Sequence, residues 1–111
     1  MKDRKAITTK QLKLRELNFV FDGATDLVSG FDELGIESVV DIGAGNYTFI
    51  FKDKFERACQ LKGFGMMTAD SDLVVQAVDV DRITVLTRTA GTAADTKFSL
   101  SVLGSDGRFN Y

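Results

Sequence analysis

The fold is decided by one stretch of sequence, Ser38-Val-Val-Asp-Ile-Gly-Ala-Gly-Asn-Tyr-Thr-Phe-Ile-Phe51. In it, two runs rich in β-branched and aromatic residues flank a short turn that contains two glycines. A loop of this length with glycine between such runs is typical of a β-hairpin. The stretch therefore predicts an antiparallel hairpin over about residues 38–52. Gly43 or Gly45 is expected at positive φ, which other residues adopt only with strain.

The same two-residue period recurs along the rest of the chain. In the last strand, over residues 97–103, Phe98, Leu100 and Val102 alternate with polar residues, as in a strand with one face in the core and one in water. Residues 52–58 are too few for a stable helix and are interpreted as a loop or a single turn. The period also predicts strands over residues 17–21, 73–78 and 83–89, and a further strand is expected over about residues 59–68. Such short strands with frequent turns predict an all-β fold, a small antiparallel β-sandwich or jelly-roll.

Length and composition indicate one globular domain. The chain has 111 residues, of which 44% are hydrophobic and 27% are charged, and these values are ordinary for such a domain. We expect a basic N-terminal arm over residues 1–16, a body over residues 17–104 and a tail over residues 105–111. No apolar run approaches the ~20 residues of a membrane span, and residues 1–16 lack the pattern of a signal peptide. Synthesis and use without secretion, and no membrane partner, are therefore expected.

Charge is unevenly distributed along the chain. Residues 1–15 hold six basic side chains against one acidic one, and the remaining residues hold eight basic and 15 acidic ones, so the net charges are +5 and −7. A cationic arm on an acidic body predicts docking of the arm on an acidic surface, and a solvated terminus is the alternative. The residues predicted to contact a partner are Lys2, Arg4, Lys5, Lys10, Leu12, Lys13, Leu14, Arg15, Phe109 and Tyr111.

Residues that perform chemistry are scarce. The chain has no His and one Cys, so a Ser–His or Cys–His pair and an ordinary zinc site cannot be built. Gly43-Ala-Gly45 lacks the third glycine and the following helix of a dinucleotide-binding loop. The carboxylates of Asp70-Ser-Asp72 and Asp79-Val-Asp81 are interpreted as turn residues rather than calcium ligands, and Cys59 as a buried thiol. We expect no enzyme activity and no catalytic, cofactor-binding or metal-binding residue.

The aromatic residues are expected mainly in the core, because several of them alternate in predicted strands. A binding platform is the alternative for this set. Phe109 and Tyr111 follow the last predicted strand and are better candidates for contact with another chain. The aromatic residues assigned to the core are Phe19, Phe21, Phe31, Tyr47, Phe49, Phe51, Phe55, Phe64 and Phe98.

The hairpin and its surroundings resemble a small β-sandwich module of structural proteins from tailed phages. The resemblance spans about residues 18–104. Gly35 stands where Asn is usual, and residues 1–16 and 105–111 have no counterpart in the module. The elements that carry the resemblance are Phe19-x-Phe21-Asp22-Gly23, Ile36-x-Ser38-Val39, Asp41-x-Gly43-x-Gly45-x-Tyr47-Thr48-x-x-Phe51, Phe55-x-x-Ala58, Asp95 and Gly104.

In size and in its basic arm, the whole chain resembles the small capsid decoration proteins, also called staple or cement proteins, of short-tailed phages of the epsilon-fifteen type. The resemblance implies a jelly-roll-like body that clamps neighbouring major capsid proteins from outside, as a homodimer at a two-fold axis. It implies synthesis in the host cytoplasm and a final location on the outer capsid surface of the virion.

Two other binding functions stand beside this one. Some structural relatives of the sandwich are carbohydrate-binding modules, so the alternative is a glycan-binding module on a virion surface or on a tail or head fibre. Tyr47, Phe109 and Tyr111 are the aromatic residues available for it. Direct nucleic-acid binding is not expected, because the acidic body would repel phosphate.

Overall fold

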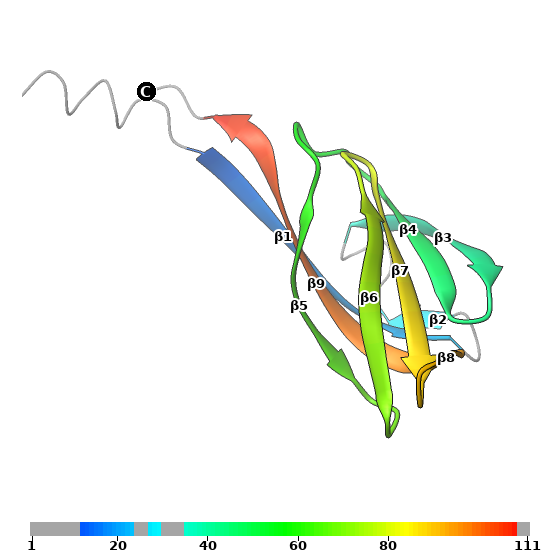
Figure 1. Ribbon diagram of the computed structural model, residues 1–111. Helices are drawn as coiled ribbons and strands as arrows, with labels where there is room; N and C mark the ends of the chain where they lie inside the picture. The colour runs from blue at the N-terminus through cyan, green and yellow to red at the C-terminus, as the bar shows by residue number, and fades with distance from the viewer. Residues whose placement is uncertain (1–11, 24–26, 30–34, 109–111) are drawn as a thin grey trace, which may run out of the picture.

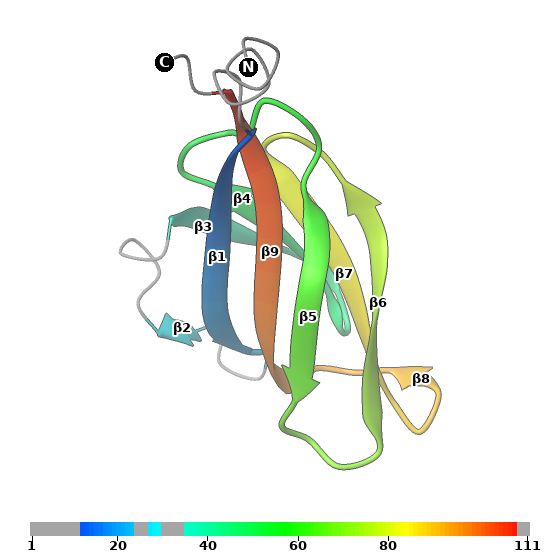
Figure 2. The same cartoon turned by 90° about the vertical axis from the view of Figure 1, so that its left-hand side faces the viewer.

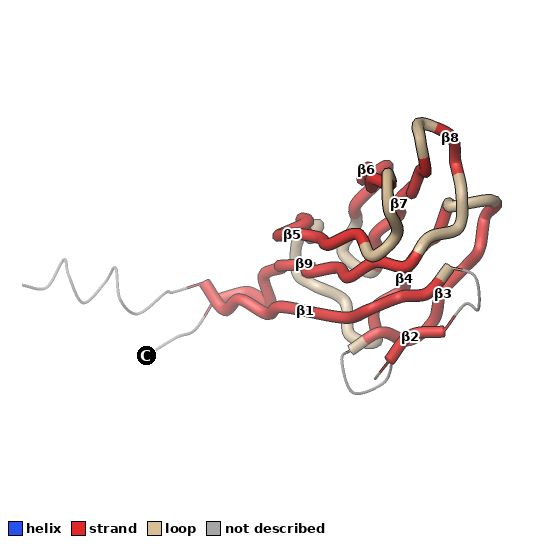
Figure 3. Tube along the Cα trace, turned by 90° about the horizontal axis from the view of Figure 1, so that it is seen from below, coloured by secondary structure: helices blue, strands red, loops and turns tan. Residues whose placement is uncertain are grey.

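The computed structural model describes residues 12–23, 27–29 and 35–108, which form nine β-strands and no helix (Figure 1). Two antiparallel sheets pack against each other, as Figure 3 shows. The predicted all-β sandwich is confirmed. Its physical basis is the two-residue period, which gives each strand one apolar face, so that two sheets are needed to bury both sets of faces.

Each sheet contains segments that are far apart in the sequence (Figure 2). Sheet A has the order β2-β1-β9-β5, with β1 at Leu12–Asp22, β2 at Leu27–Ser29, β5 at Gln60–Met66 and β9 at Lys97–Arg108. Sheet B has the order β3-β4-β7-β6, with β3 at Ile36–Gly43, β4 at Asn46–Phe51, β6 at Ser71–Val78 and β7 at Arg82–Thr89. The short strand β8, at Thr92–Ala93, pairs with β7.

The core between the sheets is built largely from aromatic rings. Phe21 lies 4.7 Å from Tyr47 and 5.1 Å from Phe49, measured between ring centroids, in edge-on contacts that rings favour. Phe64 was expected in the core, and this is wrong, because its side chain is 48% exposed. It lies opposite Leu100 of β9, but β5 is the edge strand of sheet A. Phe31 lies outside the described residues, and the other seven aromatic residues assigned to the core are buried: Phe19, Phe21, Tyr47, Phe49, Phe51, Phe55 and Phe98.

The predicted hairpin is confirmed as the pair β3–β4. Gly45 has a φ of 68°, while Gly43 is not at positive φ. A Cβ atom at Gly45 would lie 2.4 Å from the carbonyl oxygen of Thr87 and 2.6 Å from that of Ala94. Glycine is therefore required at position 45 for two reasons, the backbone conformation and the close approach of neighbouring backbone.

The first and last strands are longer than predicted. β1 begins at Leu12 and β9 ends at Arg108, so residues 12–16 and 105–108 are strand rather than arm and tail. The physical reason is mutual pairing: Leu12 lies opposite Arg108 and Leu14 opposite Ser105. Each segment supplies hydrogen-bond partners to the other, which neither segment reveals when read alone.

One end of this strand pair lies beyond the rest of sheet A. β5 pairs with β9 only as far as Leu103, and β2 pairs with β1 only at residues 20–22. In the described part of the chain, residues 12–15 and 104–108 therefore pair only with each other, and we call them the ribbon end (Figure 1). Because Leu12 lies opposite Arg108, residues 1–11 and 109–111 both join the body there.

Candidate protein-binding site

The ribbon end holds all the predicted contact residues that the structure describes. Leu12, Lys13, Leu14 and Arg15 lie on β1. The side chain of Leu14 is 58% exposed, the highest value among the exposed large hydrophobic residues of the described part of the chain. The other predicted contact residues lie outside the described residues: Lys2, Arg4, Lys5, Lys10, Phe109 and Tyr111.

Arg15 is engaged within the chain. Its Nε and Nη2 atoms donate to the two carboxylate oxygens of Asp106, at 2.8 and 2.9 Å. Nη2 also donates to the carbonyl oxygen of Asp53 at 2.9 Å, and the guanidinium lies 4.2 Å from the centroid of the Phe55 ring. This two-point geometry uses the shape of arginine, which lysine lacks. In the structure Arg15 thus binds a neighbouring segment of its own chain.

That segment, residues 52–59, is held against β9 by Phe55. The Phe55 side chain is 1% exposed and lies 5.3 Å from Phe51, between ring centroids. It packs on Gly104, where an added Cβ atom would lie 2.4 Å from the ring. The amide of Glu56 donates to the carbonyl oxygen of Ser105 at 2.8 Å. The segment has no helix, as predicted, and it forms a wall beside the ribbon end.

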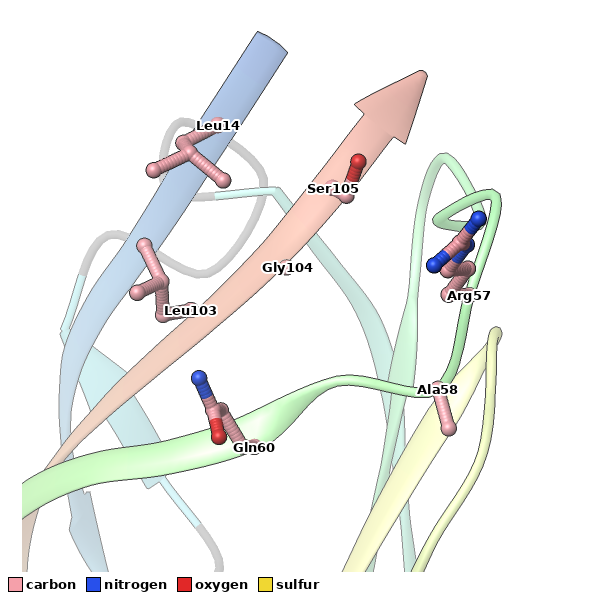
Figure 4. Close-up of a pocket in the computed structure, with 7 residues that line it drawn as sticks. All are labelled: Leu14, Arg57, Ala58, Gln60, Leu103, Gly104 and Ser105. Atoms are coloured by element: carbon pink, nitrogen blue, oxygen red, sulfur yellow. The ribbon is translucent and has the colours of Figure 1, made fainter. Parts of the chain in front are cut away.

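A groove of 260 Å³ lies between this wall and the strands. Figure 4 shows the Leu14 and Leu103 side chains next to each other on β1 and β9, with Arg57 and Ala58 on the opposite side. Leu14 and Leu103 lie on the face of sheet A that points away from the core, because the buried residues Leu17 and Val102 occupy alternate positions. The groove is lined by Leu14, Arg57, Ala58, Gln60, Leu103, Gly104 and Ser105.

Charges around the groove are only partly paired. Glu16 accepts a hydrogen bond from Lys62 and another from Asn18 at 2.9 Å, and these bonds lower the pKa of Glu16. The carboxylate of Asp106 is held by Arg15. Among the described residues, the exposed guanidinium of Arg57 makes no ion pair or hydrogen bond. The groove thus combines an apolar side with an unpaired positive charge.

Sequence reasoning missed Arg57 and Leu103, which line the groove. Leu103 gave a signal, because it extends the solvent-facing side of β9, where Lys97, Ser99 and Ser101 are polar. An apolar residue at the end of the polar face of a strand indicates either that the strand ends there or that the residue contacts another part of the protein or a partner. No pattern in the sequence indicated Arg57, whose place depends on the packing of Phe55.

The residues that carry the phage-module resemblance have a structural role here. The carboxylate of Asp95 accepts hydrogen bonds from the Tyr47 hydroxyl and from the amide of Gly45, the latter at 2.9 Å. The Thr87 hydroxyl donates to the carbonyl oxygen of Ala94 at 2.8 Å. The first two bonds fasten the hairpin to Asp95, and the third fastens β7 to Ala94. Tyr47 is fully buried, so the expectation that it could hold a glycan is wrong.

Low pH is expected to weaken the hydrogen bonds that join the hairpin to the Asp95 carboxylate. The bonds from Tyr47 and Gly45 lower the pKa of Asp95 in the folded chain below its unfolded value of about 3.9. Their contribution to stability is therefore complete above about pH 4 and is lost as the pH falls through the lowered folded-state pKa. Thermal unfolding from pH 7 to pH 2 should show a smaller loss of melting temperature in Asp95→Asn than in the unmodified protein.

Asp70→Asn is the matched control for this measurement. The Asp70 carboxylate is exposed and forms no hydrogen bond among the described residues, so this variant removes a charge without removing the fastening. An Asp95→Asn protein with the same acid dependence as Asp70→Asn would contradict the prediction.

Three of the remaining candidates for chemistry are engaged in structure, namely Cys59, Asp72 and Asp81. Cys59 is a free, buried thiol, as predicted, and burial raises its pKa. Asp72, interpreted from the sequence as a turn residue, lies instead in β6 opposite Arg88 of β7 and pairs with it at 2.9 Å, while Asp81 pairs with Arg82 at 3.0 Å. Within residues 12–23, 27–29 and 35–108, no group of three or more side chains is placed to bind a metal ion.

Comparison with known proteins returned no match among family models, curated proteins or solved structures. The described residues include no helix long and apolar enough to cross a membrane. The site is therefore defined by its own geometry: a groove with an apolar side and an unpaired cation, at the end of the molecule that residues 1–11 and 109–111 join.

Proposed function

We propose that this protein is a non-catalytic component of a phage virion that binds the outside of the capsid and clamps neighbouring major capsid proteins. The observation that carries the proposal is the ribbon end. The basic residues 1–11 and the aromatic residues 109–111 are joined to the body at the same end of the β-sandwich that carries the groove. A clamp needs binding contacts at the periphery of a body with a well-packed core. Such contacts require no catalytic residue.

The physics of a repeated lattice favours such a clamp. Binding to the assembled shell stabilises the shell by mass action. Contacts that are weak singly become strong when one molecule engages two subunits, because the second contact forms at high effective concentration. Exposed ion pairs contribute about 0–1 kcal/mol each, so the basic residues also need apolar contacts beside them. Leu14 and Leu103 provide these contacts at the point where the basic segment joins the body.

The proposal places the protein on the outer capsid surface as a homodimer, with the major capsid protein as its partner. Its support is the resemblance, together with the fit of the fold to the sandwich that the resemblance implies. A glycan-binding role has less support, because Tyr47 is in the core and the other two aromatic residues named for it lie outside the described residues.

Deletion of residues 1–11 is expected to leave a folded body that binds undecorated capsids at least about tenfold more weakly, the loss expected when several contacts are removed. Deletion of residues 1–16 would not separate a loss of capsid binding from a loss of folding, because it also removes Arg15 and part of β1. The measurement is co-sedimentation of each protein with purified capsids, together with the temperature at which the capsids break open.

Salt should reduce the binding of the intact protein only in part, since screening acts on charges and not on apolar contacts. A variant lacking residues 1–11 that occupies capsids fully and protects them from heat would show that the segment is only a solvated terminus. Absence of binding by the intact protein to any capsid preparation would refute the proposed function.

A further inference from the structure

We propose that the groove at the ribbon end binds an extended acidic segment of the partner protein. In this complex an apolar side chain of the segment lies between Leu14 and Leu103, and a neighbouring carboxylate pairs with Arg57. The inference rests on the proposed function, because it assigns the surface and the chemistry of the contact that the function requires.

The size and shape of the groove favour a protein side chain. Its 260 Å³ is below the range of about 300–1,000 Å³ that is usual for small-molecule pockets. It is also partly open to solvent rather than enclosed. A groove of this kind accommodates one or two side chains of a segment that passes over it.

The apolar half of the contact comes from two leucines that the fold brings together. Leu14 lies opposite Ser105, and Leu103 lies opposite Glu16, so the two side chains share one face of adjacent strands. Single exposed apolar residues are ordinary on protein surfaces. Here one of them, 58% exposed, adjoins a second leucine at the rim of a groove. Covering such a pair removes apolar surface from water and provides an anchor for a partner.

Charge complementarity decides in favour of an acidic segment. Two carboxylates at the ribbon end are already paired, Glu16 with Lys62 and Asp106 with Arg15, whereas the guanidinium of Arg57 makes no ion pair among the described residues. Residues 1–11, which lead into the ribbon end, add four basic side chains against one acidic one. A basic segment would be repelled here, and an acidic one would be attracted and oriented.

Two pairs of variants test the contact on capsids. Leu14→Thr removes the apolar anchor, and Ile42→Thr makes a comparable change at a residue that is 56% exposed on the β3–β4 hairpin. Arg57→Glu reverses the unpaired charge, and Lys97→Glu makes the same change in charge at the start of β9, away from the ribbon end. Leu14→Thr and Arg57→Glu should each weaken co-sedimentation with capsids about tenfold, equivalent to about 1.4 kcal/mol, and the controls should not.

A second measurement separates failure of this inference from failure of the proposed function. The methyl signals of Leu14 and Leu103 are followed by nuclear magnetic resonance while a blocked peptide that alternates aspartate with leucine is added. A peptide that alternates lysine with leucine is the control. We expect the acidic peptide alone to shift both signals, and we expect Arg57→Glu to abolish the shift.

The outcomes are distinct. Equal shifts with both peptides, or none with either, would overturn the groove assignment whatever the capsids show. Capsid binding that Leu14→Thr and Arg57→Glu leave intact would overturn the groove as the contact while leaving the proposed function in place. Peptide binding at the groove without any binding to capsids would support the acidic ligand and refute the capsid as its source.

Discussion

Replacement of Gly45 by valine is expected to lower the free energy of unfolding by about 3–5 kcal/mol. The φ of 68° at this position is strained for a β-branched residue, and its Cβ atom would overlap the carbonyl oxygens of Thr87 and Ala94. Neither oxygen belongs to a side chain that could rotate away. The loss would also disturb the amide that donates to Asp95. Urea unfolding followed by far-ultraviolet circular dichroism measures the effect.

Gly43→Val is the matched control. It makes the same change in the same hairpin, at a position with ordinary φ where an added Cβ atom meets no atom within 4 Å. We expect it to cost less than about 1 kcal/mol, as exposed strand substitutions do. Equal losses in the two variants would contradict the assignment of the turn conformation to Gly45.

Replacement of Phe55 by alanine is expected to cost about 3–5 kcal/mol, the usual range for a buried phenylalanine. The ring fills the space above Gly104 and contacts Phe51 and the Arg15 guanidinium, so its removal leaves a cavity and an unsupported arginine. The groove should be lost as well, because Arg57 and Ala58 are positioned by this packing. Thermal unfolding measures the first effect and the Leu14 methyl signal the second.

Phe64→Ala provides the comparison within the same residue type. Its side chain is 48% exposed on the edge strand β5, so less apolar surface returns to water on unfolding. A cost of about 1 kcal/mol or less is expected. Equal losses of stability in the Phe55→Ala and Phe64→Ala variants would contradict the prediction that burial of the side chain sets the cost of its removal.

Much of the fold could be predicted because its causes are local. Alternation along β4 and β9 reports which side chains face the core, and glycine in the 43–46 turn reports a reversal of the chain. The absence of histidine likewise settles, from composition alone, which nucleophile and metal sites cannot be built. Of the candidate site, only the location on β1 near Leu14 was indicated, by charge and by the start of the fold pattern.

What the sequence by itself determined about this protein is the period of its strands, the hairpin and the composition of its core, since each depends on residues close together in the chain. Only the tertiary structure decided that Phe55 is buried while Phe64 is exposed, because burial depends on whether a segment covers a sheet or lies at its edge. It also decided that Arg15 serves the fold and that Leu14, Leu103 and Arg57 border one groove. Leu14, Leu103 and Arg57 come from three segments of the chain. They lie close together because β1 pairs with β9 and because residues 52–59 pack on both strands. No local sequence pattern encodes these long-range contacts.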